Sequence, residues 1–360
     1  MSANVGIVAG VTGIVGLNLA NRLLSEGWKV YGISRRKPSY LPQAIQHVAV
    51  DLTDAAKCKA ELGLLKDATH LFVATWVNAG TEADNCRVNE QVMVNILDNI
   101  SRTVKDVVLV TGTKNYVGSF DDFENMNQVK QSDINQVLPF KEDQPRQPTP
   151  NFYYNQEDVL FDRSKKNGFN WYVLRPSDII GFAPFNQMNI GTTLAVYATI
   201  CKHLDIPFIF PNGTASYDIF RDASDANLIA SQIIWAVNEP KAANQAMNCV
   251  NGDVYCWRQL WQKIAEYFDI KTEEPNEIID LEKLMADKET VWDEIVQKYG
   301  LQPFKLKELT SWWFVNKVGV PISAFSSTTK TRKLGFKEYQ GTEESYAKLF
   351  DYLRKNKYIP

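Results

Sequence analysis

A glycine-rich turn near the amino terminus constrains the fold of this chain more than any other feature. The apolar run 5–9 is typical of a strand buried on both faces, and residues 17–24 have helical character. Gly10, Gly13 and Gly16 stand between them at three-residue spacing. Glycine permits positive φ in the turn and lets a dinucleotide pyrophosphate approach the backbone at the helix N-terminus. The pattern predicts a dinucleotide cradle; the alternative is a tight turn in an α/β fold that binds nothing.

Strand-like and helix-like segments alternate after this turn. Strands are expected at 28–34, 47–52, 70–76, 106–111 and 171–176, and helices at 53–65, 88–100, 151–166 and 225–237, with Thr53 as the cap of the first of these helices. This alternation is typical of a Rossmann-type, doubly wound parallel sheet that binds ligands at the carboxyl ends of its strands. The fold class is therefore predicted to be α/β.

The chain is long enough for a second, smaller domain. Residues 181–221 and 256–360 are rich in aromatic side chains at helical spacing, which indicates packing helices. We expect them to form a helix-rich substrate-binding domain, and residues 1–180 and 222–255 to form the dinucleotide-binding Rossmann domain. Residues 115–150 lose periodicity and accumulate prolines, so a long functional loop is expected there.

Composition narrows the class of ligand. Lys and Arg number 39 against 42 Asp and Glu, which leaves a net charge of −3, and 45% of the 360 residues are hydrophobic. This balance does not favour nucleic acid or a membrane surface, so a small molecule is the expected partner. Five cysteines without CxxC spacing and three scattered histidines predict free thiols and no metal. A cytoplasmic location is expected because no signal segment or bilayer-spanning run is visible, and a homodimer is left open.

The end of the second expected strand indicates which cofactor is bound. Ser34, Arg35 and Arg36 stand where an NAD site commonly has an acidic residue for the ribose 2′-hydroxyl. Arginine beside a small hydroxyl suits a 2′-phosphate, so NADPH is predicted. The alternative is a solvated basic turn before Pro38. Asp51 is expected near the adenine edge.

Three motifs together identify a family. The glycine turn is joined by Thr-Gly-Thr-Lys at 111–114 and by Asn-Phe-Tyr-Tyr-x-x-Glu-Asp at 151–158, with support from Arg-Pro at 175–176 and Trp-Trp-Phe at 312–314. This combination resembles the progesterone 5β-reductase and iridoid synthase family of extended short-chain dehydrogenase/reductases, over nearly the whole chain. The resemblance implies NADPH-dependent reduction of the activated carbon–carbon double bond of an enone or enal.

The resemblance also implies catalytic roles for Tyr154 and Lys114. The usual Tyr-x-x-x-Lys pair is absent, because Asp158 stands four residues after Tyr154 and Glu157 four residues after Tyr153. Lys114 would supply the cation from another direction, and a phenol beside an ammonium can stabilise the enolate that forms on hydride addition. Glu157 and Asp158 are expected to be structural, since adjacent helical residues diverge by about 100°.

The expected site has two parts. The cofactor part comprises Gly10, Thr12, Gly13, Ile14, Val15, Gly16, Ser34, Arg35, Arg36, Asp51, Leu52, Thr75, Trp76, Thr111, Gly112, Lys114, Tyr154, Pro176 and Ile179. The family resemblance implies that the substrate part comprises Trp76, Tyr116, Phe120, Met188 and Phe314. Such an apolar lining suits a terpenoid, a steroid or a small cyclic enone. The alternatives are a carbonyl reductase or nucleotide-sugar epimerase of the same fold, disfavoured by the missing Tyr-x-x-x-Lys, and an NADPH-binding sensor without turnover.

Overall fold

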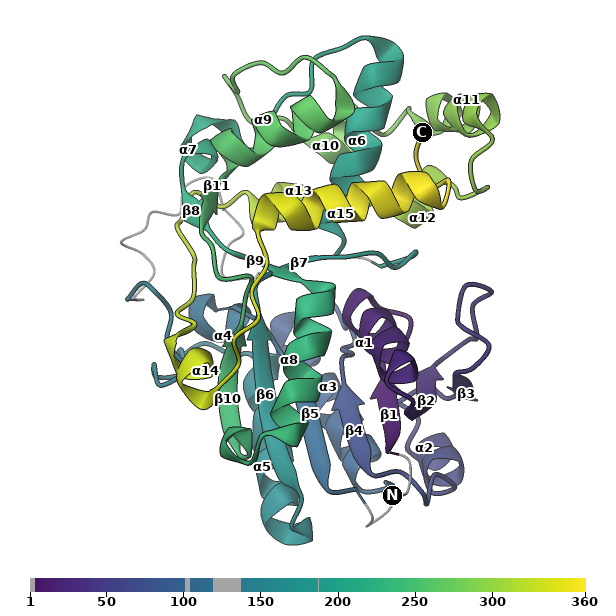
Figure 1. The fold of residues 1–360 in the computed structure, drawn as a ribbon, viewed down its shortest axis with the longest axis vertical. Coiled ribbons are helices and arrows are strands. Elements are labelled where there is room, and N and C mark those ends of the chain that lie inside the picture. The colour runs from purple at the N-terminus through teal and green to yellow at the C-terminus, as the bar shows by residue number, and fades with distance from the viewer. Residues whose placement is uncertain (1–3, 101–103, 119–136, 187) are drawn as a thin grey trace.

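A computed structural model of the protein describes residues 4–100, 104–118, 137–186 and 188–360. Figure 1 shows a lower part, in which helices cover both faces of a sheet, and an upper part made of packed helices. The α/β, Rossmann-type fold predicted from the sequence is confirmed. Within the described residues, no helix combines the length and the hydropathy that crossing a bilayer requires.

The central sheet has seven strands, all parallel, in the order β10-β6-β5-β4-β1-β2-β3. They are β1 Val5–Ala9, β2 Lys29–Ser34, β3 Gln46–Ala49, β4 His70–Val73, β5 Asp106–Val110, β6 Asn170–Pro176 and β10 Gln245–Cys249. The order reverses at β1, so the carboxyl ends of β1 and β4 lie at the topological switch point where such sheets bind ligands. The glycine turn leaves the sheet at this point.

Alternate side chains of each strand contact helices on opposite faces. Val8 of β1 and Phe72 of β4 pack on the face of α1 (Ile14–Ser25) and α8 (Ala226–Asn238), while Ile7 and Leu71 pack on the other face. That second face is covered by α2 (Ala55–Leu62), α3 (Glu82–Leu97) and α5 (Phe152–Asn167). A sheet buried on both faces explains why the strands read as continuous apolar runs.

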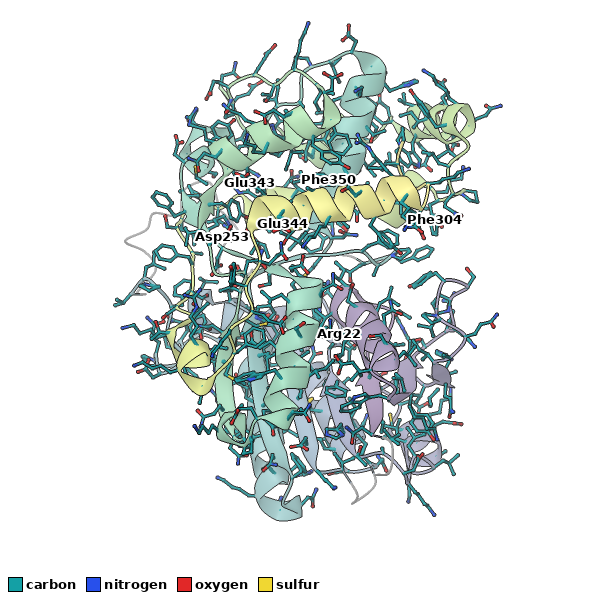
Figure 2. All side chains as sticks on the ribbon, in the orientation of Figure 1. Arg22, Asp253, Phe304, Glu343, Glu344 and Phe350 are labelled. Atoms are coloured by element: carbon teal, nitrogen blue, oxygen red, sulfur yellow. The ribbon has the colours of Figure 1, made fainter. Side chains whose placement is uncertain are left out.

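A separate apolar cluster holds the upper part together. It draws on residues 180–223 and 255–359, and this distribution supports the predicted division into two domains, whose boundaries stay a prediction. Its helices are α6 (Ile190–Leu204), α7 (Gly213–Tyr217), α9 (Trp257–Phe268), α10 (Leu281–Leu284), α11 (Glu289–Tyr299), α12 (Leu306–Leu309), α13 (Trp312–Val318) and α15 (Thr342–Lys355), while α14 (Thr329–Leu334) lies beside β10. Figure 2 shows side chains filling the space between α15 and the helices around it.

Short strands connect the two parts. β7 (Asp178–Ile180) pairs in parallel with β9 (Ala223–Asp225), and β8 (Phe220–Arg221) pairs antiparallel with β11 (Tyr255–Cys256). β7 follows the end of β6 after one residue, so it continues from the ligand-binding edge of the central sheet. The path of the chain therefore brings the upper part over that edge.

Two local expectations can be compared with the structure. The cap of α2 is Asp54, whose carboxylate accepts a hydrogen bond from the backbone N–H of Lys57, so the prediction of Thr53 was one residue early. Thr53 instead donates its hydroxyl and backbone N–H to Asp51. The five cysteines are free thiols, as predicted.

Candidate active site

The glycine turn contains two kinds of glycine. Gly10 has φ of +86°, and a Cβ there would collide with the carbonyl oxygen of Ala74; a Cβ at Gly16 would collide with the carbonyl oxygen of Gly10. Gly13, the residue before α1, has φ of −84°, and its nearest non-neighbouring atom would be 3.5 Å from a Cβ. The fold itself therefore requires Gly10 and Gly16, whereas Gly13 keeps a surface open for a ligand.

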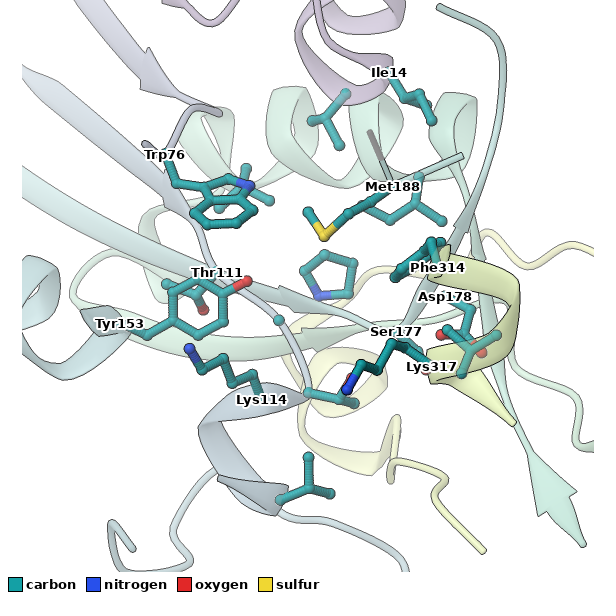
Figure 3. A pocket seen from close by; sticks show the side chains of 18 of the residues that line it. Ile14, Trp76, Thr111, Lys114, Tyr153, Ser177, Asp178, Met188, Phe314 and Lys317 are labelled. Atoms are coloured by element: carbon teal, nitrogen blue, oxygen red, sulfur yellow. The ribbon is translucent and has the colours of Figure 1, made fainter. Parts of the chain in front are cut away.

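A cavity of about 230 Å³ begins at this turn and continues over the carboxyl edge of the sheet. Figure 3 shows it from close by. Among the residues predicted to contact cofactor or substrate, those that line it are Gly13, Ile14, Val15, Thr75, Trp76, Thr111, Gly112, Lys114, Pro176, Ile179, Met188 and Phe314. The structure thus brings together residues that are up to about three hundred positions apart in the sequence.

Other predicted cofactor residues lie outside the cavity wall. Thr12 is half-buried in the turn, and the side chain of Leu52, three residues after the end of β3, is buried. The hydroxyl of Ser34 lies 2.8 Å from His47 Nε2 and donates to the carbonyl oxygen of Arg36. These positions frame the end of β2, next to the glycine turn.

The charged side chains at the end of β2 and β3 are accessible. Arg35 and Arg36 are exposed there. Hydrogen bonds from the backbone and hydroxyl of Thr53 lower the pKa of Asp51, and the charge of Arg35 lowers it further. Two guanidinium groups and one ionised carboxylate are therefore presented beside the turn.

Lys114 is held on the cavity wall by a buried carboxylate. It is the first residue of α4 (Lys114–Val117), at the end of β5, and its Nζ lies 2.5 Å from Glu82 Oε2. Both side chains are less than a tenth exposed. The ammonium also lies 4.2 Å from the ring centroid of Phe152. Glu82 was not among the predicted site residues, because it lies before the apolar residues 88–100 that indicated this helix in the sequence; in the structure it is the first residue of α3.

The structure places Tyr153, not Tyr154, beside Lys114. Tyr153 lines the cavity, and the Lys114 ammonium lies 5.9 Å from its ring centroid (Figure 3). The Tyr154 hydroxyl instead donates to the carbonyl oxygen of Asn115 at 2.7 Å and accepts from the backbone N–H of Gln147 at 2.9 Å. Consecutive residues of α5 point about 100° apart, so only one of the pair can face the cavity. The geometry therefore moves the candidate phenol from Tyr154 to Tyr153.

The sequence alone carried no signal that separates the two tyrosines. The usual tyrosine and lysine are four residues apart on one helical face, but Glu157 stands four positions after Tyr153 and Asp158 four positions after Tyr154. The missing lysine therefore does not choose between them.

Tyr153 is a protonated phenol in this setting. Burial raises the pKa of Tyr153, and the negative charge of Glu82 raises it further. A group with a raised pKa stays neutral at physiological pH and can donate a hydrogen bond. The side chain is therefore suited to bind an oxygen that gains negative charge.

Glu157 occupies the place of the usual lysine but faces other partners. Its carboxylate pairs with Arg175 and Arg146, each at 3.0 Å, and accepts from the amide of Asn115 at 3.1 Å. Asp158 pairs with Arg146 on the surface. These contacts fit the structural role predicted for both carboxylates.

The predicted substrate residues divide into three groups. Trp76, Met188 and Phe314 line the cavity. Tyr116 does not: it is buried against Phe140, and its hydroxyl donates to Asn248 at 2.6 Å. Phe120 lies outside the described residues.

Part of the apolar wall was not predicted. It is formed by Val117, Val318, Val320, Ile322 and Ala324. Most of these residues come from the segment after α13, which carries no motif and reaches the cavity only through the tertiary fold.

The chain has clear relatives of known activity. It is 38% identical over 370 aligned residues to (S)-8-oxocitronellyl enol synthase from Catharanthus roseus, covering 99% of this chain and 92% of that protein. It is equally similar to 3-oxo-Delta(4,5)-steroid 5-beta-reductase from Arabidopsis thaliana, covering 99% and 93%.

Among solved structures, UDP-glucose 4-epimerase from Thermotoga maritima superposes with a TM-score of 0.67 over 98% of this chain and 99% of its own, at 15% identity. An epimerase from Methanothermobacter thermautotrophicus gives 0.69 over 98% and 93%, also at 15%. Such low identity establishes the fold alone.

The family model described as a PRISE-like Rossmann-fold domain matches residues 47–360. This match covers most of the chain and includes the segments that carry Lys114 and Tyr153. Together with the full-length relatives, it shows that the chain belongs to the PRISE-like family, the progesterone 5β-reductase and iridoid synthase family that its motifs resemble.

Proposed function

We propose that this protein is an NADPH-dependent ene-reductase that adds hydride to the activated double bond of enones and enals. The observation that carries the proposal is the pairing of Lys114 with Tyr153 on the wall of a largely apolar cavity that begins at a dinucleotide cradle. The activities in the names of the full-length relatives, a steroid 5-beta-reductase and an enol synthase, support it.

The residues around the cradle fit NADPH. Gly13 leaves the backbone open at the start of α1, whose N-terminal N–H groups and dipole favour a pyrophosphate. Arg35 and Arg36 are exposed at the end of β2, where they would hold the 2′-phosphate. When bound, NADPH supplies the hydride for the β-carbon of the substrate.

The side chains on the opposite wall act on the substrate carbonyl. Tyr153 donates a hydrogen bond to its oxygen, and the ammonium of Lys114 stabilises the negative charge that grows there as the enolate forms. Glu82 keeps Lys114 in place. The apolar wall lowers the local dielectric constant and so strengthens these interactions. The enolate α-carbon then takes a proton from solvent.

The decisive test compares an enone with a saturated ketone. The protein is mixed with NADPH and cyclohexenone or cyclohexanone, and cofactor absorbance is followed. Products are identified by gas chromatography against authentic standards, because cyclohexanone and cyclohexenol have the same mass. We expect consumption of NADPH with the enone and a saturated ketone as product. An allylic alcohol as the product, or turnover of cyclohexanone alone, would indicate a carbonyl reductase; tight NADPH binding without turnover would indicate a sensor.

The remaining expectations are proposals of the same kind. We expect a cytoplasmic protein, and a homodimer remains one arrangement that size-exclusion chromatography with light scattering can test. The two-domain division, with boundaries at residues 181, 221 and 256, is likewise a proposal.

A further inference from the structure

Gln156 is a buried amide that has no hydrogen-bonding partner. Its side chain is 1% exposed and lines the cavity. Within the described part of the chain, neither Oε1 nor Nε2 forms a hydrogen bond. Buried amides are nearly always satisfied, because desolvation without a new hydrogen bond is unfavourable. Both ends of this amide are therefore available to a ligand.

The position of Gln156 indicates which ligand. It lies three residues after Tyr153 on α5, so the two side chains share one side of the helix. Ala74 and Thr111, at the ends of β4 and β5, line the same cavity. In a doubly wound sheet, the carboxyl ends of the strands beyond the pyrophosphate cradle are where the far half of a dinucleotide lies.

Glu157, the next residue on α5, is not available to bind a neutral group of a ligand. Glu157 stands where short-chain dehydrogenases usually have a lysine, but its carboxylate is committed to Arg175, Arg146 and Asn115. A carboxylate also lacks the donor that a hydroxyl or carboxamide oxygen accepts from. Gln156 offers a donor and an acceptor together.

We propose that Gln156 binds the nicotinamide riboside half of NADPH, with Nε2 donating to and Oε1 accepting from one neutral group of that half. A neutral amide matches a carboxamide or a ribose hydroxyl, each of which is both donor and acceptor, better than it matches a phosphate. The proposal rests on the NADPH dependence proposed above and assigns Gln156 a binding role in addition to the roles of Lys114 and Tyr153.

Direct binding measurements test this assignment. Gln156→Met keeps the length of the side chain and removes both polar ends. Affinities for NADPH and for 2′,5′-ADP, which lacks the nicotinamide riboside, are measured by calorimetry without substrate. Gln91→Met, the same substitution at an exposed position of α3, is the control. We expect Gln156→Met to bind NADPH about tenfold more weakly, the change that one or two neutral hydrogen bonds produce, and 2′,5′-ADP unchanged.

Thermal unfolding separates this role from a structural one. The ligand-free Gln156→Met protein should melt at the same temperature as the wild type or higher, because an unsatisfied buried amide has been removed. A lower melting temperature with equal losses for both ligands would mean that Gln156 only supports the fold. Unchanged affinity for NADPH would also overturn the proposal.

A cofactor analogue distinguishes the two neutral groups. The 3-acetylpyridine analogue of NADPH lacks the carboxamide nitrogen but keeps the ribose. If the carboxamide is the partner, the substitution should affect binding of the analogue less than binding of NADPH; if the ribose is the partner, both should weaken alike. If these binding effects are found but the protein does not reduce enones, the assignment of Gln156 stands and the proposed ene-reductase function is wrong.

Discussion

Glu82 connects the two groups proposed to act on the substrate. Its Oε2 lies 2.5 Å from the Nζ of Lys114, and its Oε1 accepts the backbone N–H of Phe152, the first residue of α5, at 2.9 Å. Lys114 and the helix end that carries Tyr153 are therefore held by one buried carboxylate. A negative group at a helix N-terminus is also favourable for the helix itself.

Glu82→Gln should impair both turnover and stability. The change leaves the buried ammonium of Lys114 without its carboxylate, which costs about 3 kcal/mol in comparable buried pairs. We expect a lower free energy of unfolding in urea and a lower kcat, with little change in the dissociation constant of NADPH. Glu90→Gln, an exposed position of α3, is the control. Wild-type kcat in Glu82→Gln would contradict a positioning role.

Tyr153→Phe and Tyr154→Phe should have different effects. Removing an oxyanion donor costs about a hundredfold in kcat, and we expect this for Tyr153→Phe with NADPH affinity intact. Tyr154→Phe loses the hydrogen bonds to Asn115 and Gln147, so it should destabilise the protein by about 1 kcal/mol and keep most of its activity. Steady-state kinetics and urea unfolding of both variants test this prediction. A large loss of kcat in Tyr154→Phe but not in Tyr153→Phe would indicate that Tyr154 is the catalytic phenol.

Gly13→Ala should weaken cofactor binding without unfolding the protein. Its backbone is in an ordinary region and a Cβ would find space, so the melting temperature should change little. NADPH titration should show a loss of affinity because the Cβ lies where the pyrophosphate approaches. Gly16→Ala is the contrast: its Cβ would meet the Gly10 backbone, and a fall in melting temperature is expected. Equal NADPH affinity in Gly13→Ala and the wild type would refute the cradle.

Replacing Arg35 and Arg36 together by alanine should change cofactor preference. Two charge-assisted hydrogen bonds to a 2′-phosphate would be lost, so we expect the KM for NADPH to rise about ten- to a hundredfold and that for NADH to stay nearly constant. Lys59→Ala combined with Lys165→Ala, two exposed changes on α2 and α5, controls for the loss of two positive charges. Equal rises for both cofactors would show that the arginines form only a solvated turn.

Asp222 should make stability depend on pH. Burial raises the pKa of Asp222 from 3.8 to about 6, and its Oδ1 has no hydrogen-bond partner among the described residues. The pKa of Asp222 is higher in the folded protein than in the unfolded chain. The protonated Asp222 therefore contributes its full share to the free energy of unfolding below pH 4, and that share is lost as pH rises through 6. By pH 8 the ionised form should cost about 3 kcal/mol.

Asp222→Asn removes this titration and can still accept the hydrogen bond that Oδ2 now takes from Ser326 N–H at 2.7 Å. Urea unfolding between pH 4.5 and 8 should therefore show the variant gaining stability relative to the wild type as pH rises. Parallel curves would mean that Asp222 titrates normally.

The sequence predicted the sheet well where each strand carries its own signal. The apolar runs of β1, β4, β5 and β6 were recognised, whereas β10 was not, because Gln245 and Asn248 interrupt it. That segment becomes a strand by pairing with β6, a partner about seventy residues earlier in the chain. Propensity alone does not encode such a pairing.

The structure brings some of the predicted site residues together and leaves others apart. Lys114, Trp76, Met188 and Phe314 line the cavity, while Tyr116 packs against Phe140 in the core. Gln156 was missed because an isolated glutamine on a helix carries no motif.

The sequence by itself determined the Rossmann-type fold, the family and the position of the glycine turn, because glycine spacing, apolar runs and short motifs are local properties of the chain. Only the tertiary structure decided that Tyr153 rather than Tyr154 faces Lys114, and that Glu82 holds Lys114 in place. The physical reason is rotational: neighbouring side chains on α5 differ by about 100°, and the packing of that helix on α3 and the sheet selects which of them reaches the cavity.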